Sequence, residues 1–133
     1  MSGSLNTLVP SAAAGVFVMV GSAAASNLQR FRQPGLWWIP AVLSALFFAG
    51  SLRAVSTGGI FGFWTEHIRN DWNNQIFIDL LLCAACAYLL LLTRARAVSM
   101  KVLPWFVLIA ATGSIGLLAM VARVLFLERR ATI

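Results

Sequence analysis

With 133 residues, 60% of them hydrophobic and 11% charged, the chain is too apolar for a soluble domain of its size, and we expect one domain. Ten Lys and Arg against four Asp and Glu give a net charge of +6, yet nearly every basic residue ends an apolar run. Basic residues placed this way anchor helices at lipid headgroups, which argues against nucleic acid as a partner. The predicted fold is all-α, an integral membrane four-helix bundle of two antiparallel helical hairpins in the cell (inner) membrane.

The first predicted span covers residues 9–28. It is rich in small residues, and Gly21 and Ala25 are four apart on one face, a spacing that lets membrane helices approach closely. No Lys or Arg occurs in residues 1–10, so the run lacks the basic start of a signal peptide and we expect a retained helix.

The second predicted span covers residues 36–53. A basic turn at residues 27–35 precedes it and ends in Pro-Gly, a strong helix breaker. Trp37, Trp38 and Pro40 then mark its entry at the membrane interface.

The longest polar connection covers residues 54–74. Its apolar residues recur at helical spacing, which predicts a short amphipathic helix at the membrane surface between the second and third spans. These residues are Phe61, Phe63, Trp64, Ile68 and Trp72.

The third and fourth predicted spans cover residues 74–93 and 102–127, joined by a basic turn at residues 94–101. The third is almost entirely apolar but contains Asp79. A charged group inside a bilayer costs roughly 2.5–3.5 kcal/mol on insertion scales, so Asp79 should have a partner.

The basic residues do not decide which way the chain faces. Four spans would place Arg30, Arg32, Arg94, Arg96 and Lys101 on one side and Arg53, Arg69, Arg123, Arg129 and Arg130 on the other. The uncharged start of the first span, followed by arginines, favours both termini on the outside.

Asp79 is the main candidate for a functional residue. A tight hairpin would make the third and fourth spans antiparallel neighbours and would bring Arg123 to the same side of the membrane. We therefore predict an Asp79–Arg123 pair, with Arg53 as the alternative partner. The pair would either hold the helices in register or form the polar floor of a ligand-binding pocket.

Glu66 and His67 lie on the long loop with Trp64, and Glu66 and Asp79 are the candidate acids for catalysis. A single His without a ligand pattern predicts neither a metal site nor a cofactor, and pairing of Glu66 with Arg69 explains the cluster more simply. The Cys83-x-x-Cys86 motif has redox spacing, but its apolar surroundings favour two core cysteines. The aromatic residues are typical of interfacial belts, although they would also suit an isoprenoid ligand.

The second half of the chain resembles a family of short bacterial inner-membrane proteins of unknown function. The resemblance covers residues 58–130 and rests on an aromatic, acid-containing loop over residues 64–74, an Asp that opens a helix, a basic turn with a Met, and an aromatic and Pro start to the last helix. The matching positions are Asn74, Asp79, Met100, Pro104 and Trp105, with Val98-Ser99 standing where the family has Leu-Gly. The resemblance marks Asp79 as a position of interest and implies no mechanism.

Three functions fit these observations. The first is a non-catalytic binding or accessory subunit with a polar Asp/Arg site, whose partners are the bilayer, a hydrophobic lipid, or other chains in a homo-oligomer or larger membrane complex. The second is a membrane enzyme acting on an isoprenoid-type lipid, resembling the small terpene cyclases, which need one acid in an aromatic pocket. The third is a small-multidrug-type transporter working as a dimer. Whether the chain is an enzyme is left open by its residues.

Overall fold

The computed structural model describes residues 2–26 and 34–131, and the regular secondary structure of this part consists of helices, without strands. The contacts divide the chain between Gln33 and Pro34 into two units, which are described separately.

The first unit contains α1 (Ser2–Ser26), a 25-residue helix with Pro10 inside it. The Ser22 hydroxyl donates to the Val18 carbonyl at 2.8 Å, so this polar side chain is satisfied by its own helix. The predicted first span falls within α1 as far as Ser26, and its last two residues lie outside the described part.

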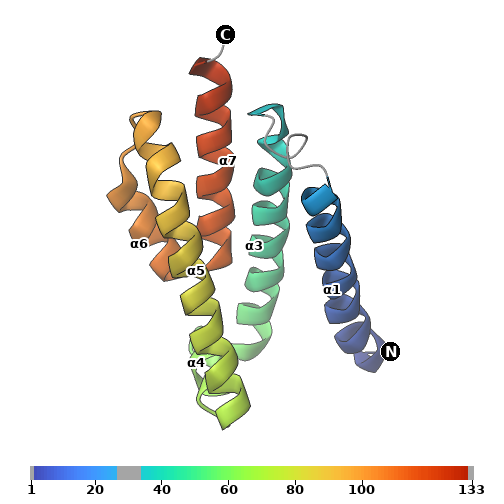
Figure 1. Cartoon of the computed structure of the whole chain (residues 1–133). Helices are drawn as coiled ribbons and strands as arrows, with labels where there is room; N and C mark the ends of the chain where they lie inside the picture. Colours follow the sequence, from blue (N-terminus) through green and yellow to red (C-terminus); the bar gives the residue numbers. More distant parts are fainter. Residues whose placement is uncertain (1, 27–33, 132–133) are drawn as a thin grey trace. The chain divides into compact units, whose positions relative to one another are not determined.

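The second unit contains six helical elements, and Figure 1 labels five of them, α3 to α7. They are η1 (Pro34–Leu36), α3 (Trp38–Gly58), α4 (Gly62–His67), α5 (Asp71–Ala97), α6 (Val102–Thr112) and α7 (Ser114–Ala131). Two of them, α3 and α5, are long and apolar enough to cross a membrane. Both predicted middle spans are therefore helices, and both run several residues further than the sequence suggested.

A sharp corner joins α4 to α5. The side chain of Asn70 caps α5 by accepting from the Asn73 N–H at 2.9 Å, and the Asn73 amide donates back to the Glu66 carbonyl at 2.8 Å. The predicted short helix between the second and third spans exists as α4, but it ends at His67, and Trp72 belongs to α5.

The predicted fourth helix over residues 102–127 is not continuous. It breaks at Gly113, whose φ of +60° lies in the region that favours glycine, and whose N–H donates to the Ile109 carbonyl at 2.7 Å. The chain then folds back, and a Cβ added at Gly116 would stand 2.9 Å from the backbone of Leu108 and Ile109. The missing side chain at Gly116 therefore lets α6 and α7 touch backbone to backbone, and a bundle of four spans is not confirmed.

The direction of α7 also differs from the prediction. Arg94 near the end of α5 pairs with Glu128 near the end of α7, so these helices run parallel to each other rather than antiparallel. In Figure 1 the junction of α6 and α7 lies beside the middle of α5, and both C-terminal ends lie at the same end of the unit.

The core of the second unit surrounds α7, which packs against α3, α5, α6 and η1. Its buried centre consists of Ala95, Ile109, Met120 and Val124. The Ser44 hydroxyl, itself buried, donates to the Ile115 carbonyl at 2.9 Å and ties α3 to the start of α7. This packing covers the C-terminal half of α5 and leaves its N-terminal half largely uncovered.

Candidate functional site

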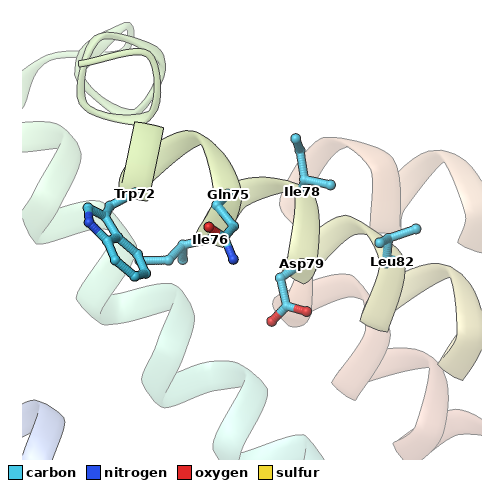
Figure 2. Close-up of a pocket in the computed structure, with 6 residues that line it drawn as sticks. All are labelled: Trp72, Gln75, Ile76, Ile78, Asp79 and Leu82. Atoms are coloured by element: carbon cyan, nitrogen blue, oxygen red, sulfur yellow. The ribbon is translucent and has the colours of Figure 1, made fainter. Parts of the chain in front are cut away.

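A groove runs along the N-terminal half of α5 and has a volume of about 310 Å³. Its lining residues are Trp72, Gln75, Ile76, Ile78, Asp79 and Leu82. Figure 2 shows the Asp79 carboxylate projecting from α5 on the same side as the Trp72 indole. All six residues come from one helix, so a ligand held here would have its far side uncovered by the second unit.

The expected Asp79–Arg123 pair does not form, and neither does the alternative with Arg53. Within residues 2–26 and 34–131 the ion pairs are Glu66–Arg69 and Arg94–Glu128, and Asp79 accepts no hydrogen bond. Arg123 instead places its guanidinium carbon 5.7 Å from the ring centre of Phe126. The prediction of the pair is wrong because it assumed that α7 runs antiparallel to α5.

Asp79 lies level with the turn between α6 and α7. Arg94 and Glu128 define one level, and Asp79 lies 15 residues before Arg94 in α5, about 22 Å along the axis. Ser114 lies 14 residues before Glu128 in α7, about 21 Å along its axis. Since the two helices run parallel, an exposed carboxylate and the only interruption of the α6–α7 backbone occur at the same height.

The turn between α6 and α7 is itself polar. Thr112 Oγ1 donates to the Leu108 carbonyl at 2.7 Å and accepts from the Gly116 N–H at 3.0 Å. One hydroxyl thus satisfies a carbonyl near the end of α6 and an N–H near the start of α7. Ser114 at the start of α7 is exposed, so this turn presents hydroxyl and backbone groups to its surroundings.

Glu66, His67 and Trp64 belong to a separate cluster at the α4–α5 corner. Glu66 pairs with Arg69 at 3.2 Å, which confirms the local pairing expected from the sequence. The His67 Nδ1 hydrogen-bonds the Phe63 carbonyl, and its ring packs edge-on against Phe77 at 4.7 Å. Glu66 and His67 are therefore held by local contacts at the corner and are not among the residues that line the groove with Asp79.

Within the described residues the potential metal ligands do not gather in one place, and the two cysteines are not in the core. No group of three or more His, Cys, Asp or Glu side chains in the described residues could hold a metal ion. Cys83 and Cys86 are both exposed on α5, so the prediction that they are core residues is wrong. They face outward because α6 and α7 cover the other side of the helix.

The sequence analysis did not find the ion pair between α5 and α7. Arg94 donates from Nε and Nη2 to the two carboxylate oxygens of Glu128, at 2.9 and 2.6 Å. Such a two-pronged pair is geometrically specific. The sequence feature that could have indicated this pair is a single glutamate, Glu128, among basic residues at the end of the last apolar run.

Comparisons with protein-family models, curated proteins and solved structures found no match for this chain. The resemblance of residues 58–130 to an inner-membrane family therefore stays a prediction.

Proposed function

We propose that this chain is a multi-pass protein of the inner membrane that acts as a non-catalytic subunit. It binds a partner through the face of α5 that carries Gln75 and Asp79. The observation that carries the proposal is an exposed carboxylate, without an ionic or hydrogen-bonding partner in the described part of the chain, on a long apolar helix.

The membrane location is supported by how little of α3 and α5 the protein covers. Over their most apolar windows, 11% of the residues in α3 and 6% of those in α5 are buried within the structure. Core helices of soluble proteins are mostly buried, whereas these two present large apolar side chains outward. Such apolar surfaces are suited to contact with lipid or with another membrane protein.

Asp79 makes an isolated second unit unfavourable in lipid. It lies two turns inside α5, at the height of the polar α6–α7 turn. Polar backbone at membrane depth is tolerated only against protein or water, and a carboxylate there costs several kcal/mol without a partner. Two independent polar features at one height therefore favour a surface that another molecule covers.

The charge of Asp79 indicates what the partner supplies. The α1 helix contains no Asp, Glu, Lys or Arg, so it carries no cationic side chain of its own. A symmetric pair of copies joined through this face would bring two Asp79 side chains together, which is repulsive. The best match is a helix of a different membrane protein that carries Arg, Lys or several hydrogen-bond donors.

A transporter is the second candidate, and the same two features favour it. Broken helices and an acid at one depth are typical of ion and substrate sites in transporters. In that case water, not protein, faces Asp79, and the assembly contains only copies of this chain. The isoprenoid enzyme fits less well, since carbocation chemistry needs an enclosed pocket and this groove is formed by one helix.

Photo-crosslinking in native membranes tests the proposal. A photoreactive residue replaces Leu82, which lines the groove, or Leu89, an exposed leucine two turns further along α5 as the control. We expect a discrete protein adduct from position 82 that is weakened at least tenfold by Asp79→Asn. A loss of about 2 kcal/mol at the carboxylate corresponds to a change of this size.

Other outcomes separate the alternatives. An adduct with the mass of two copies of this chain would support the transporter. Adducts with lipid alone at position 82, unchanged in Asp79→Asn, would contradict the subunit proposal.

A further inference from the structure

The fold-back at Gly113 gathers positive charge at one end of the second unit. This basic end, where α5 and α7 finish and α6 begins, carries six cations and one acid, Glu128. The cations are Arg94, Arg96, Lys101, Arg123, Arg129 and Arg130. The opposite end, around α4, carries Arg53 and Arg69 with Glu66 and Asp71, so it has no net charge.

Glu128 does not neutralise this end. It pairs with Arg94 through two hydrogen bonds, and the net charge of the six cations and this one acid is +5. A single continuous fourth span would have split the same residues between the two sides of a membrane. The hairpin therefore turns an even distribution of charge into a strongly uneven one.

Two of these cations lie against the same aromatic ring. The guanidinium carbons of Arg123 and Arg130 lie 5.7 and 4.6 Å from the centre of the Phe126 ring. Trp37 packs edge-on against the same ring, with 5.2 Å between centres. Cation–π contacts of this kind orient guanidinium groups, and Trp is typical of the headgroup level of a bilayer.

We propose that the basic end binds the phosphates of anionic phospholipids in the cytoplasmic leaflet. Arg123 and Arg130 hold one headgroup phosphate beside Trp37, while the remaining cations attract the negatively charged surface. Guanidinium groups match phosphate oxygens through paired hydrogen bonds, and clustered cations next to membrane helices recognise anionic lipids. The inference rests on the proposed membrane location but not on the proposed partner of Asp79.

Lipid titration of the purified full-length protein tests this site. Binding of phosphatidylglycerol, measured by native mass spectrometry from neutral detergent, is compared with that of phosphatidylcholine and inorganic phosphate. We expect preference for phosphatidylglycerol, little effect of free phosphate, and affinity that falls as salt rises. Arg123→Gln with Arg130→Gln should weaken phosphatidylglycerol binding by roughly tenfold to thirtyfold, since each cation near an anionic surface contributes about 1 kcal/mol.

The matched control is Arg53→Gln with Arg69→Gln, which removes two cations from the opposite end. Equal losses in the two double variants, or equal binding of the two lipids by the unaltered protein, would overturn the proposal. Asp79→Asn should leave lipid binding unchanged, so the site and the subunit function can fail separately.

A reporter measurement independent of these variants tests the leaflet. The positive-inside rule predicts that a green fluorescent protein fused after Ile133 fluoresces and that alkaline phosphatase fused there is inactive. The reverse result would place the basic end outside and contradict the assignment. It would agree instead with the expectation from the sequence that both termini lie outside.

Discussion

The two halves of α5 differ sharply although they belong to one helix. Near its C-terminal end, Ala95 is fully buried, and Arg94 donates two hydrogen bonds to the Glu128 carboxylate. Near its N-terminal end, Asp79 is exposed and unpaired within the described residues. The difference arises because α6 and α7 reach only half the length of α5, so one half is packed by its own chain and the other depends on its surroundings.

This comparison separates structural charge from functional charge. A partly buried ion pair between neighbouring helices fixes their register, as Arg94 and Glu128 do for α5 and α7. A lone carboxylate that the fold leaves uncovered makes no such contact within its own unit, and the proposed function assigns it to a partner.

The largest expected effect comes from filling the contact between α6 and α7. Gly116→Leu should destabilise the second unit by about 3 kcal/mol, because any side chain there meets backbone at 2.9 Å. The matched control is Gly50→Leu in α3, where nothing lies within 4 Å, and which should be neutral or slightly stabilising. Unfolding in mixed micelles, followed by circular dichroism, measures both. Equal effects of the two changes would contradict the close packing of the hairpin.

A smaller effect is expected from breaking the pair at the covered half of α5. Arg94→Gln should cost about 1.5 kcal/mol, since it leaves the partly buried Glu128 carboxylate without its charged partner. Glu66→Gln, which breaks the exposed pair with Arg69, should cost less than about 0.5 kcal/mol in the same assay. The exchanged variant, Arg94→Glu with Glu128→Arg, should recover part of the loss. If Arg94→Gln behaves like Glu66→Gln, the two halves of α5 do not differ in the way described.

The smallest effect concerns the turn that follows the covered half. Ser99 has a φ of +55°, a left-handed conformation that costs a non-glycine residue about 1 kcal/mol. Ser99→Gly should therefore stabilise the second unit by about that amount. Ser51→Gly, inside α3, should instead destabilise it by about 0.5 kcal/mol. A loss of stability in both variants would show that the turn is not strained at Ser99.

The long helices α3 and α5 could be predicted from their apolar composition. The division of the last helix into α6 and α7 could not, because it depends on the backbone conformation of one residue, Gly113. The apolar runs of α3 and α5 are visible as runs. The corner before α5 was missed, because Trp72 was assigned to the preceding short helix. The break at Gly113 was hidden, because Ala110, Ala111, Gly113 and Ser114 read equally well as the small-residue face of one continuous span.

That one error propagated into the predicted site. A continuous fourth helix would bring Arg123 toward Asp79, whereas the hairpin carries it away from Asp79, toward the C-terminal end of α5, where it lies beside Phe126. Asp79 could be predicted as a candidate functional residue from its chemistry alone, since placing a carboxylate in an apolar membrane helix costs free energy whichever helices lie beside it. Its partner depended on the direction of α7, which no local pattern encodes.

The parallel course of α5 and α7 is the central claim, and one distance tests it most directly. Spin labels replace Arg96 and Arg129, both exposed, in a background with Cys83→Ala and Cys86→Ala. Pulsed electron–electron double resonance on the full-length protein in nanodiscs should give a distance between the two spin labels below about 25 Å, as for two neighbouring helix ends. A separation of about 40 Å, the length of a helix that spans the bilayer in the opposite direction, would contradict the account.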